Sequence, residues 1–153
     1  WNELVQWITT TGLDKCERNV WVIQVPRAYR VLRRKGHIKS FGDLIDNLFR
    51  PLFQVMLDPS SNVPLYNLLY SVSGFDSVDD ESAPELNTVW PENPHEWTRD
   101  EEPPYAYWLY FLKANLHTLN MLKGKKEKRR KKERRREKEK KKKRLFYYLI
   151  PFF

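Results

Sequence analysis

The first quarter of the chain contains two different hydrophobic patterns. In residues 1–10 the apolar side chains recur at the spacing of one helix face: Trp1, Leu4, Val5 and Ile8. This spacing predicts a short amphipathic helix. Residues 19–25 instead form a nearly continuous run of β-branched and aromatic residues, which is typical of a strand buried on both faces of a parallel sheet. We expect Pro26 to end this strand.

A longer helical pattern begins after Ser40. Its apolar positions lie three and four residues apart: Phe41, Leu44, Ile45, Leu48, Phe49, Leu52 and Phe53. Ser40 and Asp43 stand where a capping residue and a first-turn acidic residue belong. Because Pro51 has no backbone N–H, it is expected to kink this helix or divide it near Phe49.

The next elements complete a parallel crossover. An apolar cluster after Pro64 predicts another short helix, and residues 69–75 have the composition of a second strand. Two strands joined by helices, over a connection too long for a hairpin, pair in parallel. In such folds the functional side chains gather where the strands end. Here those positions are Arg27 and the acidic residues 76–81.

The rest of the chain divides by composition. Residues 82–104 form a loop rich in Pro, Asn and acidic residues, long enough to cover a site. A Pro-Pro pair at its end is expected to begin a helix with an apolar face made of Tyr105, Trp108, Leu112, Leu116 and Leu119. Residues 123–144 are almost pure Lys, Arg and Glu, and residues 145–153 are apolar. We therefore divide the chain into residues 1–122, 123–144 and 145–153.

Charge is concentrated in one segment. The 153 residues carry a net charge of +8, yet residues 123–144, from Lys123 to Arg144, hold 17 basic and 4 acidic residues. The remainder holds 11 basic and 16 acidic residues and is mildly acidic. The basic segment therefore predicts nonspecific binding of polyanions, such as nucleic acid or an anionic membrane surface.

Simple features limit the class of protein. Cys16 is the only cysteine, which excludes an internal disulfide and a multi-cysteine zinc site and favours a reducing compartment. No run approaches the roughly 18 apolar residues of a membrane-spanning helix, so no membrane span is expected. The chain begins without an initiator Met or a basic leader, which predicts a piece of a longer protein without a secretory signal.

Several motifs, in a fixed order, resemble the AMP deaminases. They are residues 19–27 (NVWVIQVPR), residues 47–53 (NLFRPLF), residues 74–82 (GFDSVDDES) with Pro84 and Glu85, and residues 103–107 (PPYAY) with 114–116 (ANL). The resemblance covers about residues 1–122 and is expected to stop at Lys123.

The resemblance implies zinc-dependent hydrolysis of AMP to IMP and ammonia on a (β/α)₈ barrel. In that reaction a metal-bound water attacks C6 of the purine while an acidic residue manages the protons. Because 153 residues are fewer than the roughly 250 of a complete barrel, we expect an incomplete (β/α)₈ barrel of the TIM type. Its basic C-terminal extension is predicted to be helical or disordered. The family also implies a cytoplasmic homo-oligomer.

We expect no zinc site in these residues. By resemblance, the family's zinc ligands come from a His-x-His element before Trp1 and from a His and an Asp after residue 122, where the catalytic Glu also lies. The histidines present, His37, His95 and His117, form no His-x-His pair and are interpreted as ordinary side chains. The chain alone is therefore predicted to have no catalytic residue, no metal ligand and no deaminase activity.

The resemblance places the turn after the second strand beside the purine. The predicted substrate-binding residues are Asp76, Asp79, Asp80, Glu81 and Arg27. Asp76 is expected to contact the residues that bind the substrate and not the substrate itself. Asp79 or its backbone N–H is expected to approach the base. A solvated acidic loop or a divalent-cation loop is the alternative for these carboxylates, which would repel the AMP phosphate. For Arg27 the alternatives are a charged contact with substrate and a structural salt bridge.

The basic segment favours an alternative function, a polybasic protein that binds nucleic acid or an anionic surface. Four glutamates within it, Glu127, Glu133, Glu137 and Glu139, would allow a solvated helix to form. Residues 123–144 contain no aromatic side chain to read bases, so any binding would be nonspecific. A retained intron or a misjoined gene model would also explain why the run begins where the resemblance is expected to stop.

Overall fold

The computed structural model describes residues 1–16, 18–80, 84–85, 89–91 and 93–148, with side chains as far as residue 140. Its helices and strands are α1 (Asn2–Thr10), β1 (Trp21–Pro26), α2 (Tyr29–Arg34), α3 (Phe41–Leu57), α4 (Val63–Ser71), β2 (Val72–Val78) and α5 (Tyr105–Tyr148). Short 3₁₀ turns lie at Leu13–Lys15, Pro59–Ser61 and Pro94–Glu96. The chain divides into two compact units, residues 1–116 and 117–153.

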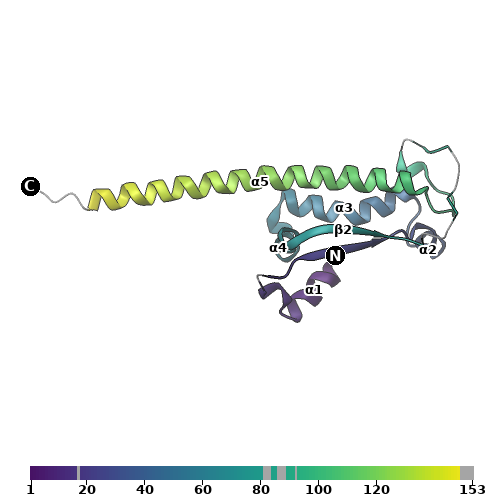
Figure 1. The fold of residues 1–153 in the computed structure, drawn as a ribbon, viewed down its shortest axis with the longest axis horizontal. Helices are drawn as coiled ribbons and strands as arrows, with labels where there is room; N and C mark the ends of the chain where they lie inside the picture. Colours follow the sequence, from purple (N-terminus) through teal and green to yellow (C-terminus); the bar gives the residue numbers. More distant parts are fainter. Residues whose placement is uncertain (17, 81–83, 86–88, 92, 149–153) are drawn as a thin grey trace, which may run out of the picture. The chain divides into compact units, whose positions relative to one another are not determined.

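The first unit contains the predicted parallel crossover. β1 and β2 pair in parallel, with Val25 opposite Ser77 and Pro26 opposite Val78, and the chain between them runs through α2, α3 and α4. Figure 1 shows α3 on one side of the two strands and α1 on the other. The described fold is therefore mixed and mostly helical, with a small two-stranded parallel sheet.

The second strand begins later than the sequence predicts. Residues 69–71 belong to α4, and β2 starts at Val72. Leu68 and Leu69 are 6% and 4% exposed on α4, so burial of these side chains keeps this stretch helical. As a consequence Asp76 lies within β2, opposite Gln24, and not in the turn after the strand.

The prediction that β1 is buried on both faces is wrong for these residues. Val25 is 5% exposed, whereas Val22 is 59% exposed. Successive side chains of a strand point to opposite faces, and the sheet of the described residues has only two strands. One set of β1 side chains therefore remains open to solvent.

α3 begins as predicted but is not divided by Pro51. The Ser40 hydroxyl accepts a hydrogen bond from the Asp43 backbone N–H, and the Asp43 carboxylate accepts one from the Ser40 N–H, which completes a capping box. The helix then continues through Pro51 to Leu57. Phe49 and Leu52 on either side of the proline are 1% and 0% exposed, and their packing outweighs the one backbone hydrogen bond that proline removes.

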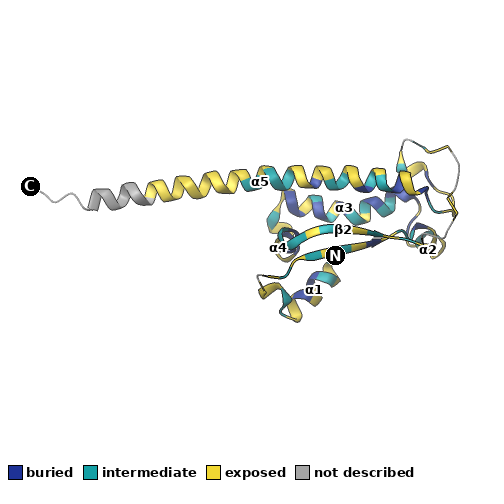
Figure 2. Cartoon of the chain, viewed as in Figure 1, coloured by how far each residue is buried: buried dark blue, intermediate teal, exposed yellow. Residues whose placement is uncertain are grey.

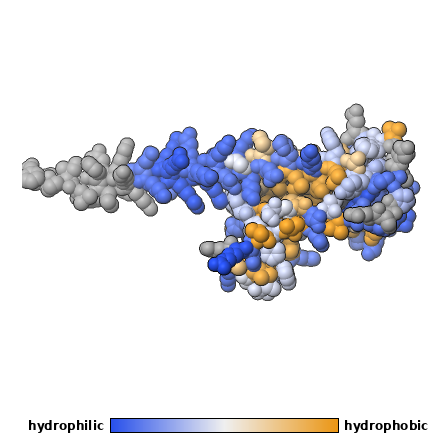
Figure 3. Space-filling view, viewed as in Figure 1, coloured by the Kyte–Doolittle hydropathy of each residue, from blue (hydrophilic) through white to orange (hydrophobic). Residues whose placement is uncertain are grey.

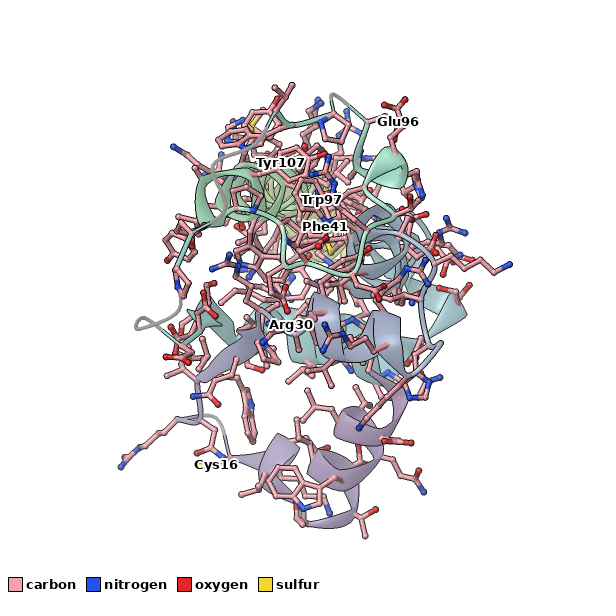
Figure 4. The ribbon with its side chains drawn as sticks, turned by 90° about the vertical axis from the view of Figure 1, so that its right-hand side faces the viewer. Cys16, Arg30, Phe41, Glu96, Trp97 and Tyr107 are labelled. Carbon is pink, nitrogen blue, oxygen red and sulfur yellow. The ribbon has the colours of Figure 1, made fainter. Side chains whose placement is uncertain are left out.

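The core of the first unit is aromatic. Phe41 of α3 lies 5.5 Å from Tyr107 and 5.8 Å from Trp108 between ring centroids, and Trp97 lies 5.8 Å from Tyr107. Figure 4 shows Phe41, Trp97 and Tyr107 gathered in one region. The buried Tyr29 hydroxyl donates to the carbonyl oxygens of Trp97 and Arg99, at 3.1 and 2.8 Å. The loop segment before α5 is therefore anchored in the core.

α5 starts directly after the Pro-Pro pair, as predicted. Of its predicted apolar face, Trp108, Leu112 and Leu119 are buried and Leu116 is half-buried, whereas Tyr105 is exposed. Tyr107, Trp108 and Leu112 are 4%, 0% and 5% exposed, whereas Tyr105 is 39% exposed. The Trp108 indole N–H donates to the Ser77 hydroxyl on β2 at 2.8 Å, which fixes the rotation of the helix about its axis.

The second unit is the continuation of α5 after residue 116. The described part of the basic segment is helical, which is one of the two states that the sequence predicts. Residues 128–140 are all exposed (Figure 2). Among the described residues, no helix is long and apolar enough to cross a membrane.

Candidate functional site

The carboxyl ends of β1 and β2 bring two of the predicted site residues together. Pro26 and Val78 are the last residues of the two strands, and they lie opposite each other. The residues that follow them, Arg27 and Asp79, therefore lie at the same edge of the sheet. The Arg27 backbone N–H donates to the Val78 carbonyl at 2.9 Å and extends the ladder by one residue. Parallel pairing thus places a guanidinium beside a carboxylate that is far away in sequence.

The guanidinium of Arg27 is fully engaged by neighbouring acceptors. Nη1 forms an ion pair with Asp79 and lies 2.9 Å from Glu85 Oε1, while Nη2 lies 3.4 Å from Glu85 Oε2. Nε and Nη2 donate to the Pro103 carbonyl at 3.2 and 2.7 Å. The Arg27 side chain is 7% exposed. Such a forked set of charge-assisted hydrogen bonds fixes geometry as well as charge.

Electrostatics keep this guanidinium charged. Burial acts to lower the pKa of Arg27, but the hydrogen bonds and charges of Asp79 and Glu85 outweigh it and hold the pKa above its ordinary value. The Tyr105 ring lies 5.7 Å from the guanidinium carbon and adds a cation–π contact. The positive charge of Arg27 is therefore already matched by protein groups.

Glu85 connects this cluster to the start of α5. Its Oε2 accepts the Tyr105 backbone N–H at 2.8 Å. A carboxylate at this position satisfies a helix N–H that has no partner within the helix, and it interacts favourably with the positive end of the helix dipole. Arg27 and Glu85 together join the two strand ends to the segment that leads into α5.

Glu102 is a second acidic group at this end of the sheet. Its Oε1 accepts the Arg30 backbone N–H at 2.8 Å, whereas its buried Oε2 has no hydrogen-bond partner among the described residues. Burial raises the pKa of Glu102, and the backbone hydrogen bond from Arg30 and the charges of Arg27 and Arg30 oppose that rise. Sequence reasoning missed Glu102, because nothing in its local pattern signals that the fold buries it.

Asp76 and Asp80 are the other predicted site residues that the structure describes. Asp76 is exposed within β2. Asp80 is exposed, and its backbone N–H donates to Asp79 Oδ1 at 2.8 Å. Glu81 lies outside the described residues. Among the predicted residues that the structure describes, Arg27 and Asp79 form an ion pair, and Asp80 contacts Asp79 through its backbone N–H.

Comparison with known proteins decides the family. The family model described as AMP deaminase matches residues 1–131. The chain is 46% identical over 127 residues to a probable AMP deaminase of Oryza sativa subsp. japonica, covering 82% of this chain and 16% of that protein. It is 41% identical over 127 residues to an AMP deaminase of Arabidopsis thaliana (82% and 15%) and 44% identical over 123 residues to one of Schizosaccharomyces pombe (78% and 14%). The chain belongs to the AMP deaminase family.

The match to the AMP deaminase family has two informative limits. It reaches residue 131, so it extends into the basic segment beyond Lys123, where the resemblance is expected to stop. The chain spans only about a sixth of the length of the AMP deaminases it matches.

The family resemblance predicts that the zinc ligands lie outside this AMP deaminase segment. Within the described ranges, no three His, Cys, Asp or Glu side chains are grouped so that they could hold a metal ion. His95 serves the fold instead: its Nδ1 lies 3.3 Å from the Ser40 hydroxyl and 3.5 Å from Asp43 Oδ1, at the cap of α3. His95 also packs against Gly42, where no larger side chain would fit.

A surface hollow lies at the opposite end of the sheet from Arg27. Its volume is about 460 Å³, and it is lined by residues of α1, β1 and α4, among them Trp21 and Tyr70, and by Cys16 between α1 and β1. None of the strand-end residues lines it. The hollow therefore contributes nothing to the candidate site of this family member.

Proposed function

We propose that this chain is part of an enzyme that hydrolyses AMP to IMP and ammonia. The observation that carries the proposal is the family match over residues 1–131, together with identities of 41–46% to proteins described as AMP deaminases or probable AMP deaminases. The complete activity belongs to proteins of which this chain spans 14–16%. The contribution of this segment is therefore to build and position part of the active site.

Within that enzyme we infer that β1 and β2 are neighbouring strands of a (β/α)₈ barrel. Their parallel pairing through a helical crossover supports this, because barrels of this kind are made of such units. The side chains at the carboxyl ends of barrel strands face the substrate. That position is held here by Arg27 and Asp79.

The roles of these two residues differ in the proposal. Arg27 orients the strand ends, because its guanidinium is 7% exposed and is already paired with two carboxylates and a carbonyl. We propose that Asp79, fixed by Arg27, and the exposed Asp80 line the purine pocket. The Asp79 carboxylate is partly buried and already paired with Arg27, which supports the Asp79 backbone N–H as the group that approaches the base.

Other properties remain predictions from the family resemblance. They are a zinc cofactor in the complete enzyme, homo-oligomeric assembly and a cytoplasmic location. The described residues include no group of side chains that could serve as zinc ligands.

A chimeric enzyme tests the proposal. Residues 1–131 replace the matching segment of the Schizosaccharomyces pombe AMP deaminase, and ammonia and IMP formed from AMP are measured. The chimera is expected to deaminate AMP, and the isolated 153-residue chain is expected to release no ammonia. A folded chimera without activity, beside an active unmodified S. pombe enzyme, would contradict the proposal.

Binding of polyanions through Lys123 to Arg144 is a second candidate function. The observation that favours it is the exposed helix of residues 128–140, which consists entirely of Lys, Arg and Glu. This function does not depend on deaminase activity.

A further inference from the structure

The charges of the basic helix are unequally distributed around its axis. Residues 123–140 form part of α5, and successive side chains of an α-helix are rotated by about 100°. When residues 123–140 are arranged around the helix axis at this rotation, nine cations lie within an arc of about 200°. This arc contains one carboxylate, Glu139. We call this arc the basic face; its cations are Lys125, Lys128, Arg129, Lys131, Lys132, Arg135, Arg136, Lys138 and Lys140.

The remaining arc of about 120° is electrically almost balanced. This mixed face carries the cations Lys123, Lys126, Arg130 and Arg134 and the carboxylates Glu127, Glu133 and Glu137. Opposite charges three and four residues apart on one helix face attract each other. Three of its cations, Lys123, Lys126 and Arg130, take part in interactions within the protein. The net charge of the helix is therefore concentrated on the basic face.

The basic face is exposed and offers no apolar contact. Lys125 and all its members from Lys128 to Lys140 are exposed, and the side of this part of α5 that Figure 3 shows is hydrophilic. The face extends about 22 Å along the helix axis. It can therefore meet a ligand along several helical turns.

We propose that the basic face binds the phosphate backbone of a nucleic-acid duplex without sequence preference. A duplex presents about one negative charge per 1.7 Å, which matches an extended row of cations. Arg129, Arg135 and Arg136 can hold phosphates through two hydrogen bonds each. The inference extends the second candidate function and is independent of AMP deamination.

The chemistry of residues 123–140 favours a duplex over other polyanions. Residues 123–140 contain no aromatic side chain on which the bases of a single strand could stack. They also contain no apolar side chain, whereas helices that lie in a membrane interface bury an apolar face among the lipids. Contacts to phosphate alone carry no sequence information.

Two variants with matched charge loss test the role of the basic face. The basic-face variant is Arg129→Gln, Lys132→Gln and Arg136→Gln; the mixed-face control is Lys126→Gln, Arg130→Gln and Arg134→Gln. Each removes two Arg and one Lys, and glutamine preserves helix propensity. Circular dichroism of the full 153-residue chain checks that the helix is retained in both.

Binding to a labelled 20-base-pair DNA duplex is then measured by fluorescence anisotropy between 50 and 200 mM salt. Each phosphate contact adds about 0.9 to the steepness of the salt dependence, so about five contacts weaken wild-type binding about 500-fold across this range. The basic-face variant is expected to lower the slope by about 2.7, and the control by less than 1. A duplex of permuted sequence is expected to bind equally well.

The outcomes separate the two levels of the inference. An equal loss of slope in the two variants would contradict a specific role of the basic face and would show that polyanion binding depends on net charge alone. Absence of duplex binding by the wild-type chain would contradict both the role of the basic face and polyanion binding by this segment. Tighter binding to phosphatidylcholine vesicles that contain phosphatidylserine would assign the face to lipid headgroups and contradict the duplex.

Discussion

Arginine has opposite surroundings in the two units of this protein. Arg27 is 7% exposed and is surrounded by Asp79, Glu85 and the Pro103 carbonyl, so its charge is used inside the fold. Arg136 lies on an exposed helix within a run of cations. The same side chain therefore holds a structure together in one unit and is available to an external anion in the other. Position in the fold, more than composition, decides which role a charge takes.

The largest difference in stability effect between the two units is expected when a side chain of the aromatic core is truncated. Phe41→Ala removes a fully buried ring that packs against Tyr107 and Trp108, and it should cost about 3–5 kcal/mol of unfolding free energy. Arg135→Ala in the exposed helix should change the stability of the first unit little. Urea denaturation followed by tryptophan fluorescence measures both, and similar losses would show that the two units depend on each other for stability.

Removal of Arg27 is expected to have the next largest effect. Arg27→Ala leaves the carboxylates of Asp79 and Glu85 without their cation, and loss of one partner of a buried pair costs about 3 kcal/mol or more. Because Glu85 is 49% exposed, we expect about 2–3 kcal/mol. Urea denaturation followed by tryptophan fluorescence measures this loss of unfolding free energy.

Arg27→Lys gives a sharper test of the forked geometry. Lysine keeps the positive charge but cannot form the parallel hydrogen bonds to Glu85 and Pro103. It is expected to restore only part of the lost stability. Full restoration would mean that charge alone matters at Arg27, whereas Arg136→Ala is expected to leave unfolding almost unchanged.

Two glycines should respond to alanine with opposite sign. A Cβ at Gly42 would lie 2.4 Å from the ring of His95, so Gly42→Ala should destabilise the first unit by about 1–3 kcal/mol. A Cβ at Gly124 meets nothing within 4 Å, so Gly124→Ala should stabilise the helix by about 0.5–1 kcal/mol. Thermal unfolding followed by circular dichroism distinguishes the two. Adding His95→Ala to Gly42→Ala should restore stability if the ring is the cause.

The smallest effect concerns Glu102 and pH. Burial raises its folded-state pKa, so ionisation opposes folding, and this cost appears as the pH rises above the ordinary glutamate pKa of about 4.3. Glu102→Gln should therefore stabilise the protein near pH 7 by less than about 1 kcal/mol. That gain should disappear below about pH 4. A gain that is independent of pH would contradict an ionised, poorly solvated carboxylate at this position.

Sequence reasoning predicted much of the first unit correctly. The helix of residues 1–10, the start of α3 at its Ser40 cap and the parallel crossover depend on local spacing and chain connectivity, both of which are visible in the sequence. The start of β2 was predicted wrongly, and so was a division of α3 at Pro51, which was one of two alternatives. In both places burial of side chains by distant parts of the chain outweighed the local preference.

The candidate site was predictable in part. The order of the motifs indicated where the two strands end, and both Arg27 and Asp79 were predicted as site residues. Their ion pair and the participation of Glu85 depend on the parallel register, which places residues 27 and 79 at one edge of the sheet. Glu102 was not predictable, because its partial burial results from packing against residues distant in sequence.

The sequence by itself determined the AMP deaminase family, the order of the main elements and the concentration of positive charge near the C-terminus. These depend on residue identity and local spacing. The tertiary structure alone decided which charges are matched: it surrounded Arg27 with acceptors from three segments and left residues 128–140 exposed. The physical reason is that an electrostatic interaction depends on distance and burial, and both are set only when segments far apart in sequence pack together.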